Sequence, residues 1–164
     1  MEPRGSAPCK ERMKNMTTAT KNSTVELLSK MFKNMNMGKD STLDLMEKVS
    51  DEALKSDMTM QLNGYEGMLR KINEHLQAAG EEAKEENFLT KMSAKVGTAF
   101  NTMMDDSPSH IADMMIQGST MGMTDTTKLL RDYENTDASE ASLAICRSII
   151  KFEEENIERM KKHL

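Results

Sequence analysis

The sequence of 164 residues contains no tryptophan, and aromatic side chains make up only 4% of it. A hydrophobic core must therefore be built from Met, Leu, Ile, Ala and Val. Only three prolines and eight glycines are present, and Pro3 and Pro8 both lie within the first ten residues. A sheet would need more turn residues and more β-branched residues, so this composition favours long helices.

Long apolar runs and basic clusters are also missing. No apolar segment approaches the roughly 20 residues that cross a bilayer, and the N-terminal residues lack the apolar segment of a secretory signal. The formal net charge is −5, with Lys and Arg spread among Asp and Glu. This pattern does not predict nucleic-acid binding. We therefore expect a cytoplasmic protein that binds neither membranes nor nucleic acids.

The two cysteines, Cys9 and Cys146, have the spacing of neither a disulfide framework nor a zinc site. Cys9 lies in a polar N-terminal segment. Cys146 lies on the apolar side of a predicted helix, and we expect it to be a small buried core residue. No histidine lies near it in the sequence, so nucleophilic catalysis has no support.

The apolar spacing predicts helices along most of the chain. Residues 1–21 show no periodicity and are interpreted as a flexible arm, so the folded domain is expected to span 22–164. The predicted helices are 23–49, 50–79, 88–104, 108–133 and 138–163. Ser50-Asp51 and Ser107-Pro108 are start signals, and Gly80 is a stop signal. Gly38 marks either a contact between helices or a short break in the first helix.

Four of the predicted helices are long, and the one between the second and third long helices is short. A traversing segment at that position would let the flanking helices run in parallel. This is the plan of the ferritin-like bundles. The expected fold is therefore an all-α, ferritin-like four-helix bundle with a short extra helix in the crossover.

From Met92 onward the sequence resembles a group of uncharacterised ferritin-like bundle proteins. The resemblance rests on a short helix, MSAKVGTAF, a turn, DDSPSH, and the amphipathic end FEEENIERMKKHL. In those relatives the third bundle helix has a run ending Arg-Gly-Glu, whose glutamate could serve a metal site. Gln117, Gly118 and Ser119 stand at the equivalent positions here, so the resemblance implies a fold and no catalytic residue.

A ferritin-like di-iron centre uses a glutamate from each of two helices and a Glu-x-x-His motif from each of the other two. The sequence contains no Glu-x-x-His. His110 and His163 are expected near one end of the bundle and His75 near the other, so they do not predict a shared site. An iron or manganese site built from carboxylates alone stays an alternative, and its candidate ligands are Glu26, Glu66 and Glu154.

Methionine is unusually frequent, with 18 residues. Thioethers favour Cu(I), and Met31 and Met35 have the i,i+4 spacing that a chelating pair needs. The same spacing describes an ordinary apolar stripe, and methionine fills irregular cores well. Core filling is the main interpretation. Cu(I) binding and an adaptable Met-rich surface for an unidentified partner protein stay open.

Gly118 and Gly122 lie four residues apart inside a predicted helix, where glycine lowers helix stability by about 0.5–1 kcal/mol. They predict close helix packing, either against Gly38 or Gly64 or against the same patch of a second subunit. The run Glu153–Glu155 is interpreted as a solvated helix face. The bundle interior is accordingly expected to be apolar and dry.

These observations predict a non-catalytic structural or interaction module that needs no cofactor. We expect the chain to form a homodimer, because it has more Met-rich apolar surface than a single bundle would bury. The alternative function is metal handling, by a carboxylate di-metal centre or by Cu(I). The sequence itself names neither a ligand nor a partner.

Overall fold

The computed structural model describes residues 9–81 and 105–164, with side chains described from residue 23 onward. It contains four helices, α1 (Cys9–Met46), α2 (Glu52–Ala78), α4 (Pro108–Tyr133) and α5 (Glu140–Met160), and a final 3₁₀ turn, η1 (Lys161–His163). No strand occurs within those ranges. The predicted all-α class and the four-helix arrangement are confirmed for this part of the chain. The short helix predicted at 88–104 lies outside it.

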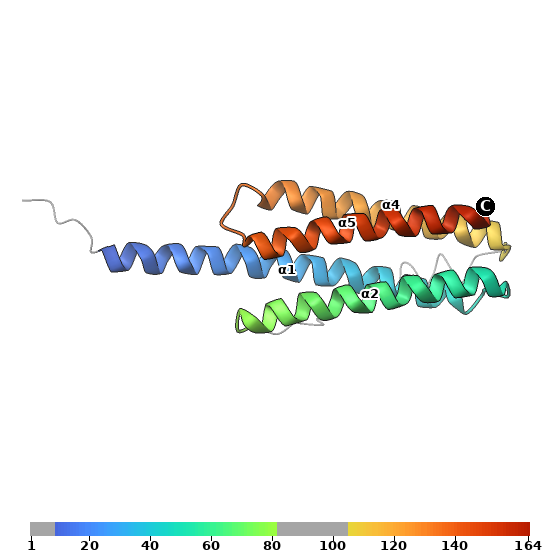
Figure 1. The fold of residues 1–164 in the computed structure, drawn as a ribbon, viewed down its shortest axis with the longest axis horizontal. Helices are drawn as coiled ribbons and strands as arrows, with labels where there is room; N and C mark the ends of the chain where they lie inside the picture. Colours follow the sequence, from blue (N-terminus) through green and yellow to red (C-terminus); the bar gives the residue numbers. More distant parts are fainter. Residues whose placement is uncertain (1–8, 82–104) are drawn as a thin grey trace, which may run out of the picture.

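The helices lie side by side in two antiparallel pairs (Figure 1). α1 packs mainly on α2, and α4 packs mainly on α5. α1 and α5 run in one direction, and α2 and α4 run in the other. The end of α2 and the start of α4 therefore lie at opposite ends of the bundle, which is the relation that a crossover between parallel helices requires.

The predicted helix ends follow local capping chemistry. The Asp51 carboxylate accepts a hydrogen bond from the Leu54 backbone N–H at 2.8 Å and caps α2. Ser107 caps α4 through the His110 N–H, with Pro108 as the first helical residue. Gly80 follows α2 with a φ of 78°, a left-handed conformation that favours glycine. All three signals are confirmed.

The first helix differs most from its prediction. α1 begins at Cys9, so the flexible arm expected over 1–21 is wrong from residue 9 onward. Residues 9–22 contain no glycine or proline and several good helix formers, which allows the helix to extend. The extension projects beyond the other helices (Figure 1), and this explains why it carries no apolar periodicity. α1 also continues through Gly38, which is therefore a contact and not a break.

Two glycines permit close contact between helices. A Cβ added to Gly38 would lie 2.7 Å from the ring of Tyr65, so α1 and α2 meet there. A Cβ added to Gly64 would overlap the ring of Phe152, so α2 and α5 meet there. The two rings contact each other edge to face, with centroids 5.0 Å apart.

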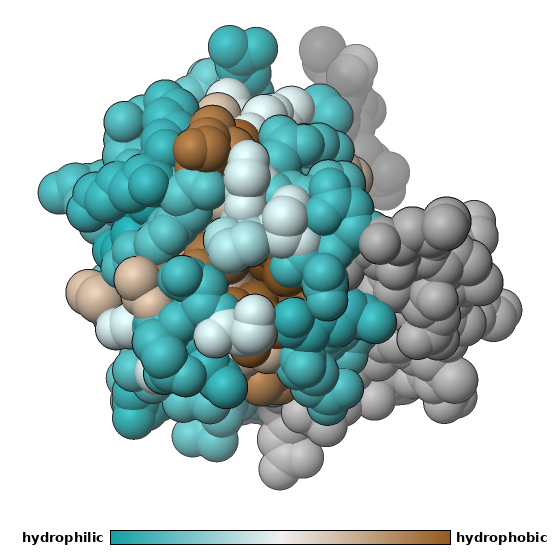
Figure 2. All heavy atoms as spheres, turned by 90° about the vertical axis from the view of Figure 1, so that its right-hand side faces the viewer, coloured by the Kyte–Doolittle hydropathy of each residue, from teal (hydrophilic) through white to brown (hydrophobic). Residues whose placement is uncertain are grey.

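The core consists of two apolar clusters separated along the bundle axis. One includes Leu27, Met31 and Ile149, and the other includes Leu45, Met58 and Met160. Figure 2 shows the end of the bundle at which α5 finishes. Apolar residues gather in the middle of this end face, and hydrophilic residues surround them. Between the two clusters each helix contributes buried polar residues, which we call the polar layer: Asn36, Thr42, Gln61, Ser119, Thr126, Glu153 and Asn156.

The polar layer corrects two expectations. The interior is not uniformly apolar, because a glutamate, three amides and several hydroxyls cross its middle. Glu153 is 1% exposed and belongs to this layer, so the prediction of a solvated face over Glu153–Glu155 is wrong for its first residue. Glu154 and Glu155 are exposed as predicted.

Candidate ligand-binding pocket

A pocket of about 430 Å³ opens between α1 and α4 and reaches down to the polar layer. Met37 and Gly38 from α1 and Met114, Gly118 and Met121 from α4 are among the residues that form its walls. Its floor includes Gln61 and Tyr65 from α2, Ser119 from α4 and Glu153 from α5. All four helices therefore contribute to one cavity.

Gly118 has no side chain to fill the pocket from the α4 side. A Cβ added at this position meets no atom within 4 Å, so no helix packs against Gly118 in the described chain. The predicted packing against Gly38 or Gly64 is wrong for this residue, and contact with a second subunit stays a prediction. At Gly122 an added Cβ would lie 3.0 Å from Oε1 of Glu153. This glycine therefore makes room for the Glu153 side chain and not for the backbone of another helix.

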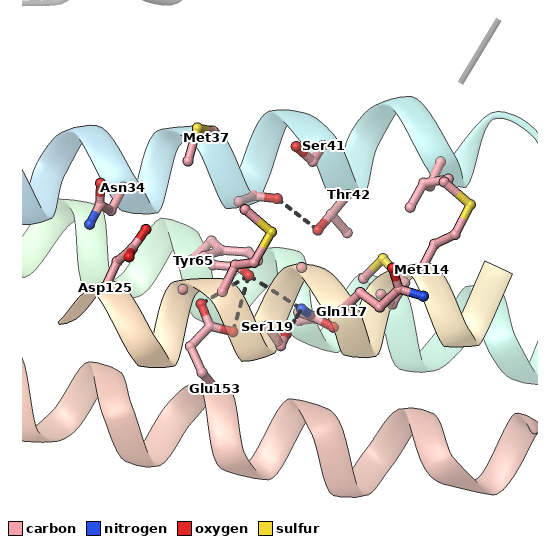
Figure 3. Close-up of a pocket in the computed structure, with 17 residues that line it drawn as sticks. Asn34, Met37, Ser41, Thr42, Tyr65, Met114, Gln117, Ser119, Asp125 and Glu153 are labelled. Carbon is pink, nitrogen blue, oxygen red and sulfur yellow. Dashed lines mark hydrogen bonds between the residues drawn. The ribbon is translucent and has the colours of Figure 1, made fainter. Parts of the chain in front are cut away.

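Glu153 rises from α5 toward Tyr65 and Ser119 (Figure 3). The Tyr65 hydroxyl donates to the Glu153 carboxylate, with oxygen distances of 3.1 and 3.2 Å. Nδ2 of Asn156 donates to Oε2 of Glu153 at 3.4 Å. Nη1 of Arg159 in turn donates to Oδ1 of Asn156 at 2.7 Å. The carboxylate is therefore held in place by neighbours on α2 and on its own helix.

The second floor group is the amide of Gln61, which is 1% exposed. Its Nε2 donates to the Ser119 hydroxyl at 3.2 Å and to the Tyr65 hydroxyl at 3.3 Å. Its Oε1 is buried and accepts no hydrogen bond from the described residues. An unpaired buried oxygen of this kind costs about 1–3 kcal/mol. Gln61 therefore brings an unpaired acceptor into the polar layer beneath the pocket.

Burial changes the acid–base chemistry of the floor. Removal of the Glu153 carboxylate from water raises its pKa from 4.5 to about 7, against the smaller lowering effect of hydrogen bonds with Ser119, Asn156 and Tyr65. Burial, with the adjacent Glu153 charge, also raises the pKa of Tyr65, which stays neutral. A carboxyl that titrates near neutrality at the base of a cavity is a functional-site candidate.

The carboxylates proposed as metal ligands do not converge. Glu26 is more than half exposed and pairs with Lys30 at 2.9 Å, and that hydrogen bond lowers its pKa. Glu66 and Glu154 also point to solvent. Within 9–81 and 105–164 no group of three or more His, Cys, Asp or Glu residues could hold a metal ion. This candidate ligand set is therefore wrong, because each residue was assigned to the inner face of its helix and lies on the outer one.

The histidines also lie apart. His75 is near the end of α2, while His110 and His163 lie toward the opposite end of the bundle. Nε2 of His163 is 2.8 Å from Oδ2 of Asp57, an ion pair across α2 and the C-terminal turn when the ring is protonated. This contact joins the C-terminal turn to the first part of α2 and forms no shared histidine site.

The sulfur residues lie in the core. Met31 and Met35 are 0% and 1% exposed, in agreement with core filling as their main role. Cys146 is buried as predicted, and burial raises the pKa of its thiol to about 11. The thiol donates to Sδ of Met31 at 3.2 Å. Cys9 has no described side chain.

The sequence interpretation missed Gln61 as a polar floor residue and Glu153 altogether as a site residue. The available signal was the register of α5, where Ile149, Glu153, Asn156 and Met160 follow one another at spacings of four, three and four. That spacing places Glu153 on the inner stripe. Glu154 and Glu155, which follow it directly, made the whole run resemble a solvated face.

Comparison with known proteins gives the fold and no more. No protein-family model matches the sequence, and no curated protein is significantly similar to it. Among solved structures, the chain is similar to a DUF305 fragment from Deinococcus radiodurans, with a TM-score of 0.64 and 14% sequence identity. The similarity covers 85% of this chain and 93% of that one. The chain therefore shares a helical, DUF305-like fold. None of its described helices combines the length and the apolar character of a bilayer span.

Proposed function

We propose that this chain is a non-catalytic interaction module whose ligand occupies the pocket between α1 and α4. The observation that carries this proposal is the coincidence of Gly118 with the floor beneath it. Gly118 leaves space where a side chain would fit without collision. The floor beneath includes Gln61, whose buried amide oxygen has no hydrogen-bond partner among the described residues. Neither feature improves packing, and both favour the binding of another molecule.

A binding role fits this floor better than a catalytic role. The Glu153 carboxylate already accepts hydrogen bonds from Tyr65 and Asn156. Within 9–81 and 105–164, the pocket lining contains no histidine, cysteine or lysine that could act with it as a nucleophile or as a second acid–base group. The arrangement can therefore orient a bound molecule through hydrogen bonds.

The binding proposal is tested with Nile red, a neutral dye whose fluorescence rises in apolar surroundings. Wild-type protein is expected to bind the dye saturably. Gly118→Leu should abolish that binding, because the new side chain enters the pocket without colliding with the protein. Gly67→Leu is the matched control, since Gly67 is also a helical glycine with nothing within 4 Å of an added Cβ, and it does not line the pocket. Equal dye binding by both variants would refute the proposal.

The finer fold assignment is also a proposal. We infer that the bundle is ferritin-like, with its crossover between α2 and α4. The parallel direction of these two helices supports this assignment (Figure 1), as does the packing of α1 with α2 and of α4 with α5. An experimental structure in which 82–104 does not run along the length of the bundle would exclude it.

Self-association is a separate proposal. The well-exposed large apolar residues of the described chain come from three helices and the C-terminus: Leu43, Met60, Met121 and Leu164. Their exposure supports association through a helix face. Light scattering should detect a homodimer at high micromolar concentration, and a mass that stays monomeric there would remove this proposal.

A further inference from the structure

We propose that the pocket takes an organic cation, a small amine whose ammonium group binds the Glu153 carboxylate while its apolar part lies between α1 and α4. This inference rests on the proposed binding function and names the chemical class of the ligand. It depends on three observations, namely the charge of the lining, the acceptors on the floor and the composition of the walls.

The lining carries charge of one sign only. Glu153 lies on the floor, and Asp125 lies on the α4 wall, half-buried and paired with Lys128 at 3.2 Å; these are the charged residues of the described lining. Among the described residues that line the pocket there is no lysine, arginine or histidine. An anionic ligand would therefore meet the Glu153 carboxylate and no cation of the described lining at the floor, whereas a cationic ligand would find the opposite charge there.

The floor offers acceptors in an arrangement that suits an ammonium group. Oε1 of Gln61 accepts no hydrogen bond from the described residues, although it is buried. The Glu153 carboxylate is held by Tyr65 and Asn156, and its two oxygens have lone-pair positions beyond those two bonds. An ammonium has three donors and no acceptor, so it can donate to the carboxylate positions that Tyr65 and Asn156 leave free. Charge-assisted hydrogen bonds of this kind are the strong ones.

The walls define the rest of the ligand. Met37 and Met114 line the pocket from α1 and α4, and Met121 lies at its exposed rim. Methionine side chains are polarizable and adapt to ligand shape. With a volume of about 430 Å³ the cavity accommodates an alkyl or aryl body in addition to the charged group. Fully hydrated inorganic cations gain nothing from such walls.

Binding should be linked to the protonation of Glu153, whose pKa burial raises to about 7. Tyr65 faces the carboxyl from α2 and Ser119 faces it from α4, while Asn156 does so from α5. Among these groups only Glu153 changes charge near neutrality. α1 adds no charged side chain to the lining, and Asp125 of α4 is the other carboxylate there. The ammonium requires the ionised carboxylate, so its affinity should rise with pH up to about 7 and then level off.

The test compares ligands of one shape and different charge by displacement of Nile red from the full chain. Hexylamine, hexan-1-ol and hexanoate are titrated at pH 8, where the amine is still protonated. We expect hexylamine to displace the dye at concentrations about tenfold or more below those of hexan-1-ol, because a hydrogen bond to a charged group is worth that factor. Hexanoate should be the weakest competitor.

Glu153→Gln tests the named residue. It keeps the shape of the side chain and removes the charge, so the preference for hexylamine over hexan-1-ol should fall to about one. Glu154→Gln, the exposed neighbour, should keep the full preference. In the wild type, hexylamine affinity should decrease by up to about tenfold for each pH unit below 7, while hexan-1-ol affinity stays constant. Glu153→Gln should lose that pH dependence.

The outcomes separate this inference from the binding proposal. If Gly118→Leu abolishes dye binding but the amine and the alcohol compete equally, the pocket binds ligands and the cation proposal is overturned. If Gly118→Leu has no effect on the dye, the binding proposal itself fails. Should Glu153→Gln not fold, the ligand comparison and the pH dependence in wild-type protein still decide the matter.

Discussion

Glu153→Gln should change the pH dependence of stability as well as binding. The folded state raises the pKa of Glu153 from 4.5 to about 7 because the carboxyl is buried. Between these two values the folded chain keeps a proton that the unfolded chain has lost. The free energy of unfolding therefore decreases as the pH rises through this window. The contribution is complete below about pH 4.5 and is lost above about pH 7.

A pKa rise of this size corresponds to about 3 kcal/mol, at roughly 1.4 kcal/mol per unit. Glutamine has no such titration. The stability of Glu153→Gln relative to the wild type should therefore increase by about 3 kcal/mol from pH 4.5 to pH 7.5. For a chain of this length that difference is roughly 10 °C in melting temperature.

Urea unfolding followed by circular dichroism at 222 nm measures this difference directly. The relevant quantity is the change in relative stability with pH, because every other titrating group is common to both proteins. Glu154→Gln is the control, since that side chain is exposed and its removal should leave the pH dependence of the wild type. Parallel stability profiles of Glu153→Gln and wild type would refute the assignment of Glu153 to a buried, water-poor floor.

Two further predictions concern packing. Gly64→Ala should destabilise the protein by about 1–3 kcal/mol in the urea unfolding assay, because the new methyl group overlaps the Phe152 ring. Gly67→Ala should stabilise it by about 0.5–1 kcal/mol in the same assay, because the space around its added Cβ is open. Met31→Leu combined with Met35→Leu should leave the fold intact and Cu(I) uptake unchanged in a competition assay with a Cu(I) chelator, because both side chains fill the core. A specific loss of Cu(I) uptake would support the copper alternative.

Local chemistry made the helices predictable. The Asp51 and Ser107 caps and the Gly80 stop each depend on residues within a few positions of the helix end. Such signals need no knowledge of the rest of the fold. The burial of Cys146 was predictable for a related reason, since it lies on a regular apolar stripe. The projecting start of α1 was not, because a helix without a partner has no apolar period to detect.

The candidate pocket was harder to predict because it depends on register. A rotation of one residue moves a helical side chain by about 100°, which is enough to exchange Glu153 and Glu154 between interior and solvent. On α5 the apolar residues Phe152 and Ile157 are only half-buried, whereas the charged Glu153 is buried. Contacts with α2 decide the true register, since Gly64 must face the Phe152 ring. That constraint links residues that are distant in the sequence.

The glycine pair of α4 shows a second limit. A glycine inside a helix indicates that a side chain is absent, but the sequence does not say whether a neighbour or an empty space replaces it. Gly38 and Gly64 accommodate aromatic rings, whereas Gly118 accommodates nothing from the described chain. The spacing of Gly118 and Gly122 suggested one common reason for both, yet Gly122 leaves room for the Glu153 carboxylate beneath it.

Three features that weaken this bundle occur together in space, while Gly67 and the unpaired hydroxyl of Thr126 lie outside the pocket lining. Gly118 lowers the helix propensity of α4, Glu153 is a carboxyl removed from water, and the Gln61 amide oxygen has no partner among the described residues. Each is unfavourable for folding, and each has a simple replacement that would be more stable. All three line one cavity between α1 and α4. Sequences depart from the most stable choice mainly where function requires it, so their convergence favours a pocket built to hold a ligand.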